Sequence, residues 1–147
     1  MDKFDEKILQ ELQRDGRLTN VELSQRVGLS PSATLRRVQE LERQKIISGY
    51  KAILNHSKMG VGFIAYVSVG LSNHSKQSQL NFESQICLAK QVVECHNITG
   101  ASEYLLRVET TDLSAYKRFH ADVLGEMPQV NSITTMVVMD TPKDDRG

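Results

Sequence analysis

The side chains with the clearest chemistry in this sequence lie in one short stretch, residues 30–43. Guanidinium and carboxamide groups can each make two hydrogen bonds to the edge of one base in the DNA major groove. On a helical wheel, Leu35, Val38 and Leu41 of this stretch share one side, with Thr34 beside them, and the polar groups lie opposite. We predict that the following side chains contact DNA: Ser30, Ser32, Thr34, Arg36, Arg37, Gln39 and Arg43.

Three predicted helices would hold these side chains at a surface. Apolar residues at helical spacing predict a first helix over residues 2–15. Thr19 and Glu22 fit a capping box at the start of a second helix, and Gly28 is typical of a helix end. Ser30 then caps a third helix. Two helices joined by a short turn with a glycine indicate a helix-turn-helix, whose second helix lies in the major groove.

The charge distribution favours this interpretation over an ordinary solvated helix face. The formal net charge of the whole chain is zero, which argues against indiscriminate binding to nucleic acid. Residues 14–51 nevertheless carry eight basic groups against four acidic ones, a net charge of +4. The modest excess of positive charge therefore lies on the predicted DNA-binding unit.

Composition excludes several other classes of protein. The chain is 39% hydrophobic and 24% charged, and it lacks the run of about 18 apolar residues that a membrane helix needs. Its first residues are charged, unlike a signal peptide, so we expect a cytoplasmic, nucleoid-associated protein with no membrane partner. Cys87 and Cys95 have neither a CxxC nor a zinc spacing and are expected to be reduced thiols.

The second half of the sequence predicts strands and helices in the order β-α-β-β-α-β. Strands are expected over residues 61–71, 92–98, 103–109 and 130–140, and helices over 75–90 and from Asp112 onward. The apolar stripes that we predict to bury these helices are Leu80, Phe82, Ile86 and Ala89, and Leu113, Tyr116, Phe119 and Val123. This order is that of a ferredoxin-like domain, with both helices on one face of the sheet.

We therefore expect an α+β protein with two domains. The predicted parts are an N-terminal helix-turn-helix (winged-helix-like) domain over residues 1–47, a hinge strand and linker over 48–60, a C-terminal ferredoxin-like βαββαβ domain over 61–141, and a frayed tail over 142–147. Apolar residues such as Ile64 and Tyr66 would fall on the sheet face that carries no helix. A second copy of the chain is the simplest cover for such a face, so we predict a homodimer through this domain.

Three stretches together resemble the Lrp/AsnC (leucine-responsive, or feast/famine) family of transcriptional regulators. They are DGRLTNVELSQRVGLSPSATLRRVQELERQKIISGYKAILN, TGASEYLLRVETTDLSAYKRF and MPQVNSITTMVVM. The resemblance implies sequence-specific binding to a roughly palindromic double-stranded DNA operator. It also implies control by an amino acid or related small metabolite, and dimers that assemble into tetramers or octamers.

The resemblance also assigns roles to particular residues. The family's recognition helix falls on residues 30–43, where Arg37 matches its most regular basic position, while Ala33 stands where proline often occurs. The family's effector site lies around the turn before the third strand and along the last strand. Here the turn keeps a glycine and a tyrosine but has alanine where the family has an aspartate. The implied effector-binding residues are Gly100, Ala101, Ser102, Glu103, Tyr104, Thr134, Thr135 and Met136.

The two alternative functions are an enzyme and a partner protein that binds an effector. Some siroheme decarboxylases share the two-domain plan, but the four histidines here, His56, His74, His96 and His120, are scattered and form no catalytic or metal-binding motif. No phosphate-binding glycine loop occurs, and neither a cofactor nor a metal is predicted. The other alternative is an effector-binding partner protein that does not touch DNA. We predict a regulator and not an enzyme.

Overall fold

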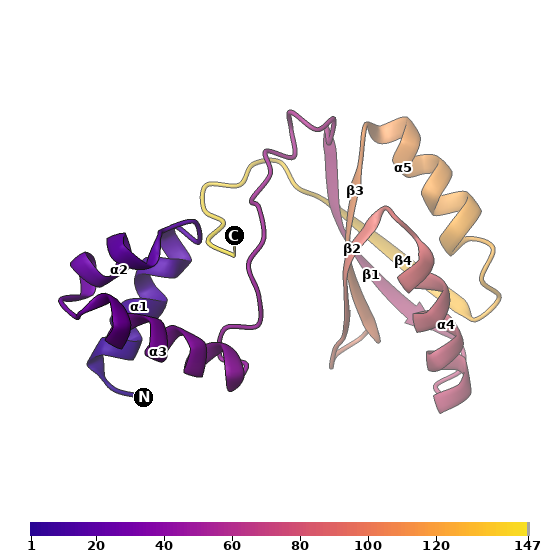
Figure 1. The fold of residues 1–147 in the computed structure, drawn as a ribbon. Helices are drawn as coiled ribbons and strands as arrows, with labels where there is room; N and C mark the ends of the chain where they lie inside the picture. The colour runs from indigo at the N-terminus through magenta and orange to yellow at the C-terminus, as the bar shows by residue number, and fades with distance from the viewer. Residues whose placement is uncertain (147) are drawn as a thin grey trace. The chain divides into compact units, whose positions relative to one another are not determined.

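The computed structural model describes residues 1–146, which form two compact units that join in sequence between Ile53 and Leu54. The first unit contains three helices, α1 (Lys3–Arg14), α2 (Asn20–Val27) and α3 (Pro31–Arg43) (Figure 1). Its core consists of Ile8, Leu23, Val27 and Leu41, with six half-buried apolar side chains packed around them.

Each helix of this unit begins at the cap that the sequence predicts. The Asp2 carboxylate accepts the backbone N–H of Asp5 at 3.0 Å, which satisfies a free donor at the start of α1. Thr19 and Glu22 form the predicted capping box of α2. Gly28 ends α2 at a φ of 79°, a left-handed conformation that favours glycine. These caps confirm the predicted helix-turn-helix.

The packing of α3 differs from the prediction at Thr34 and Leu35. Thr34 is fully buried, whereas Leu35 keeps 45% of its surface exposed. The Thr34 hydroxyl donates to the Ser30 carbonyl at 2.9 Å, so a polar residue enters the core with its hydrogen bond made. The core-facing side of α3 is therefore centred on Thr34, Val38 and Leu41, and Leu35 turns to solvent.

Residues 48–60, predicted as a hinge strand and linker, contain no strand in this single chain. These residues form an irregular segment that ends in turns, and residues 1–53 contain no β-strand that could serve as a wing. The physical reason is that an extended segment becomes a strand only when a neighbouring strand satisfies its backbone groups, and none lies beside it.

The second unit confirms the predicted βαββαβ order. It consists of β1 (Phe63–Leu71), α4 (Lys76–Leu88), β2 (Val92–Asn97), β3 (Tyr104–Thr110), α5 (Leu113–Phe119) and β4 (Val130–Val137). The strands are antiparallel in the order β2-β3-β1-β4, so β1 and β3 are central. Both helices cover the same face of the sheet (Figure 1).

The core of this unit lies between the sheet and its two helices. Ala65, Val67 and Val69 alternate along β1 toward the helices and are fully buried, as the period of two predicts. Phe82 of α4 packs against Tyr104 of β3 with 4.6 Å between ring centroids. These contacts attach α4 to the centre of the sheet.

The predicted burial of two side chains of this unit is wrong. Leu80 and Leu113 were expected inside but remain 50% and 64% exposed, because each lies on the solvent side of its helix. A single turn of π-helix, His120–Leu124, continues α5. In the predicted tail, Arg146 pairs with Asp144 and with Glu94 of β2. Such exposed ion pairs hold a segment only weakly.

Within residues 1–146, no helix combines the length and the apolar character needed to cross a membrane.

Removing the Phe82 ring tests how the core of the second unit is held together. Phe82→Ala should lower the free energy of unfolding of this unit by about 3–5 kcal/mol, because the ring is fully buried and its loss leaves a cavity. Leu88→Ala, on the same helix at 84% exposure, is the matched control and should change it little. Urea titration followed by circular dichroism measures both, and similar midpoints for the two variants would contradict this packing.

Candidate DNA-binding face and effector turn

The solvent-facing side of α3 carries most of the predicted DNA-contacting residues. Ser32, Arg36, Gln39 and Arg43 are exposed, and the caps and core contacts of α3 fix them on one side of the helix. Thr34 does not join them, because it is buried and its hydroxyl is already bonded to Ser30. We therefore remove Thr34 from the predicted set. Thr34 is instead a core residue on the inner side of α3.

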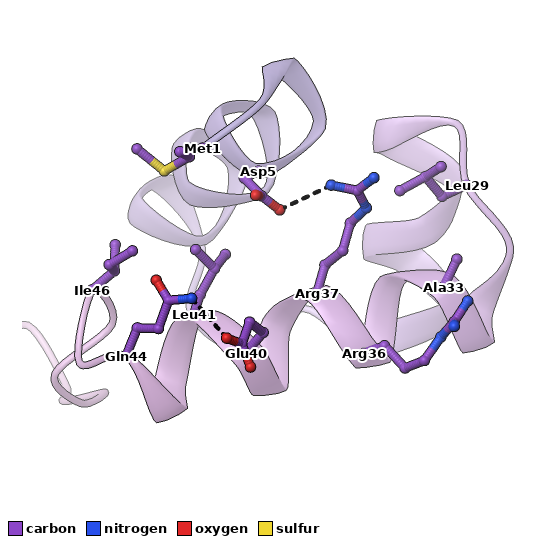
Figure 2. A pocket seen from close by; sticks show the side chains of 10 residues that line it. All are labelled: Met1, Asp5, Leu29, Ala33, Arg36, Arg37, Glu40, Leu41, Gln44 and Ile46. Carbon is purple, nitrogen blue, oxygen red and sulfur yellow. Dashed lines mark hydrogen bonds and ion pairs between the residues drawn. The ribbon is translucent and has the colours of Figure 1, made fainter.

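Arg36 and Arg37 are neighbours in sequence but differ in their surroundings. Figure 2 shows Arg37 reaching across to α1, while Arg36 extends along the surface of α3, away from Asp5. Arg37 Nη1 lies 2.8 Å from Asp2 Oδ2 and 3.1 Å from Asp5 Oδ1. Its guanidinium carbon also lies 5.3 Å from the centre of the Phe4 ring. Arg37 thus fastens the start of α1 to α3.

The electrostatics of this cluster follow from those contacts. The Asp5 backbone N–H and, next, the Arg37 guanidinium hold the pKa of Asp2 below its usual value. Hydrogen bonds from Arg37 to Asp2 and Asp5 raise the pKa of the guanidinium. The two carboxylates balance its positive charge. Arg37 is therefore better suited to positioning α1 than to reading bases.

Arg43 is exposed but is also paired with an acid. Its Nη2 lies 2.6 Å from Glu40 Oε1, one helical turn earlier, and Gln44 donates to the same carboxylate. The Arg43 and Gln44 hydrogen bonds lower the pKa of Glu40 to about 2. Among the described residues, Arg36 is the arginine of α3 with no acidic group within 4 Å. Its charge is thus the one most available to a ligand.

A hollow of about 480 Å³ borders this arrangement on the side of α1 (Figure 2). Arg36, Arg37 and Glu40 form its polar wall on α3. Leu29, Leu41 and Ile46 form its apolar wall.

The predicted effector turn, residues 100–104, connects β2 to β3. Gly100 has a φ of 122°, which favours glycine. The backbone carbonyl of Glu103 accepts the Ile98 N–H at 2.8 Å and the Asn97 side-chain amide at 3.1 Å. The turn is therefore closed by hydrogen bonds at its base, with Ala101 exposed at its tip.

The Glu103 carboxylate is fully engaged within the chain. Oε2 accepts the Leu71 backbone N–H at 2.8 Å, and Oε1 lies 2.8 Å from His74 Nδ1. Gly70 lies beside this carboxylate and permits the close approach of Ser132, because a side-chain carbon at Gly70 would collide with the Ser132 hydroxyl. Sequence reasoning missed Gly70, His74 and Ser132. The glycine inside a strand was the one available signal of a close approach.

The other predicted effector residues divide between the two faces of the sheet. Tyr104 is buried on the helix side, and its hydroxyl bonds to Glu83. Burial and, next, this bond to Glu83 raise the pKa of Tyr104 well above its usual value. Thr135 also faces the helices, where it bonds to the Tyr116 hydroxyl.

Thr134 and Met136 face the opposite side of the sheet, because strand residues alternate between faces. The predicted set is therefore not gathered on one surface. Tyr104 and Ile133 nevertheless both pair with Val69, so the effector turn and β4 lie on either side of β1 at one end of the sheet. Glu103, His74, Gly70 and Ser132 meet at that end.

Comparisons with known proteins match both units. Residues 1–48 match the family described as winged helix-turn-helix DNA-binding, and residues 64–147 match the Lrp/AsnC ligand binding domain. The chain is 40% identical to the leucine-responsive regulatory protein of Escherichia coli strain K12 over 143 residues, covering 97% of this chain and 87% of that protein. It is 41% identical to the same-named protein of Klebsiella pneumoniae over the same shares.

Solved structures agree with these matches. A transcriptional regulator from Neisseria meningitidis, crystallised as an L-Met complex, has a TM-score of 0.94 at 38% identity, covering 98% of this chain and 93% of that one. An AsnC family regulator from Agrobacterium tumefaciens has a TM-score of 0.93 at 30% identity, covering 98% and 94%. Escherichia coli AsnC, at 20% identity and a TM-score of 0.90 over 98% and 95%, supports the fold alone.

Fold and comparisons together define a DNA-binding transcriptional regulator with a separate ligand-binding domain. The chain belongs to the Lrp/AsnC family. The relatives named above are regulators and not enzymes.

The different surroundings of Arg36 and Arg37 predict different defects. Arg36→Ala should weaken specific DNA binding by roughly tenfold or more and leave the melting temperature nearly unchanged. Arg37→Ala should lower the melting temperature of the helical unit, because it leaves Asp2 and Asp5 without their cation. Fluorescence anisotropy with operator DNA and thermal melts followed by circular dichroism separate the two effects. A normal melt for Arg37→Ala would contradict its positioning role.

Proposed function

We propose that this regulator binds a roughly palindromic double-stranded DNA operator as a homodimer, and that an amino acid or related metabolite controls it. The observation that carries the DNA part is the exposed side of α3, on which Arg36 has no acidic partner among the described residues. Gln39 is exposed beside it and can read a base edge. With Thr34 removed and Arg37 held by acids, Arg36, Gln39 and Arg43 are the proposed base readers, and Ser30 and Ser32 the proposed phosphate contacts.

The homodimer is supported by the sheet face that carries no helix. Ile64, Tyr66, Met136 and Val138 lie on that face, and Met136 is 45% exposed. Arg107 lies among them, bonded to Glu109 at 2.9 Å and to the Tyr66 hydroxyl at 2.8 Å. A half-apolar face with its central charge already paired suits contact with a second copy. Further assembly into tetramers or octamers, and location at the nucleoid, belong to the same proposal.

The effector is supported by the match to a ligand-binding domain and by the likeness to the regulator crystallised with L-Met. In this chain we propose Gly100, Ala101, Ser102, Glu103, Thr134 and Met136 as effector contacts, joined by Ser132. Glu103 would meet the ammonium group of the ligand, because it is the acid of the effector turn. Tyr104 and Thr135 face the helices and would support the site from behind.

Salt dependence tests the DNA-binding proposal and the dimer together. If each subunit neutralises about four phosphates, log K plotted against log salt concentration should fall with a slope of roughly −7 for a dimer, and about half that for one subunit. Anisotropy titrations over a series of salt concentrations measure the slope. A slope near zero would mean that the basic groups of residues 14–51 do not neutralise DNA phosphates, and the proposed function would fail.

A further inference from the structure

His74 and Glu103 form an ion pair at the end of the sheet where the effector turn meets β1. His74 lies in the loop between β1 and α4, and its Nδ1 is 2.8 Å from Glu103 Oε1. The other oxygen of that carboxylate accepts the Leu71 backbone N–H at 2.8 Å. Neither oxygen of Glu103 is therefore without a partner. A ligand ammonium that uses this carboxylate must compete with His74.

The Leu71 N–H and the His74 side chain differ in how easily each can move away from the Glu103 carboxylate. Leu71 belongs to a central strand and is nearly fully buried, so its N–H is fixed in place. The His74 side chain is 69% exposed and can turn into solvent at little cost. Because Ala101 carries no charge, the effector turn offers no second acid to take over the role of Glu103. Competition between His74 and the ligand ammonium group for the Glu103 carboxylate therefore decides how much negative charge the ligand meets.

We propose that His74 is an internal competitor of the effector, which occupies Glu103 in the free protein and is displaced by the ligand ammonium group. This inference rests on the proposed function, since it assumes an effector with an ammonium group. Protonated His74 attracts Glu103 more strongly than neutral His74 does, so the competition depends on pH. Histidine is the side chain that normally changes charge between pH 5 and 8, whereas the ammonium of an amino acid keeps its charge throughout.

Few other charged groups face the His74 ring. Glu103 is the acidic side chain within 4 Å of it among residues 1–146. The other groups at this end of the sheet are the Leu71 backbone N–H, which donates to Glu103, and the Ser132 hydroxyl beside Gly70, neither of which titrates. Lys76 follows two residues later at the start of α4. The pH dependence at Glu103 is therefore assigned to His74.

Calorimetry of the full chain with L-methionine and L-leucine as probes, at pH 6 and pH 8, tests the proposal. The wild type should bind more weakly at pH 6 than at pH 8. His74→Ala should bind roughly two- to fivefold more tightly than the wild type at pH 6, as expected for removal of an exposed ion pair, and should lose the pH dependence. His74→Gln, which can still donate a hydrogen bond but never carries charge, should also lose it.

His96→Ala is the matched control, because His96 pairs with Glu94 at 3.0 Å on the same sheet and should leave binding unchanged. Glu103→Gln should abolish binding. If the wild type binds, Glu103→Gln does not, and His74→Ala matches the wild type or binds more weakly, the role of His74 is refuted while the effector proposal stands. If neither probe binds the wild type or His74→Ala, the amino-acid effector and the competition are both refuted.

Discussion

The burial of one side of α3 against α1 and α2 is the constraint on which DNA recognition depends. Thr34, Val38 and Leu41 turn inward, and this rotation fixes which side chains of the helix can meet a groove. A helix places neighbours about 100° apart, so Arg36 and Arg37 point to different surroundings. Arg37 meets the acids of α1, and Arg36 meets solvent. The choice of packing partner thus decides which arginine is free for DNA.

The same pairing accounts for a DNA-binding protein with no net charge. Four of the arginines in the helical unit lie against acids: Arg14 and Arg26 against Glu11, Arg37 against Asp2 and Asp5, and Arg43 against Glu40. Each of these pairs reduces the positive charge that is available to attract a phosphate backbone. Binding must then depend more on the fit of base-reading side chains than on charge alone. That property suits a regulator that must distinguish its operator from other DNA.

Local signals in the sequence were sufficient for the elements and their order. The capping box at Thr19, the glycine at Gly28 and the alternation along β1 each depend on residues close together in the chain, and all three are present in the structure. The errors concern how the elements pack and pair with one another, which depends on the folded unit as a whole. Thr34 enters the core only because the Ser30 carbonyl is beside it, and residues 48–60 lack the neighbouring strand that they would need. The helical wheel also predicts that Leu35 faces the core because it is apolar, although the rotation of α3 leaves it exposed to solvent.

At the effector end of the sheet, too, local features could be predicted and contacts between elements could not. The turn could be found from its glycine and acid, but the alternation of strand residues sends Tyr104 and Thr135 toward the helices. Glu103 reaches Leu71 and His74 across a gap of 32 and 29 residues in the chain, respectively, which no spacing rule detects. A regulator of this design can keep its fold while the loop around His74 changes the strength of its response.

Selection of DNA sites from a random pool, with the wild type and Arg36→Ala compared side by side, tests the central claim most directly. We expect the wild type to enrich a roughly palindromic sequence and Arg36→Ala to lose the preference at one position in each half-site, while the rest of the pattern remains. An unchanged pattern for Arg36→Ala, or no enrichment by the wild type, would contradict the assignment of α3 as the helix that reads DNA.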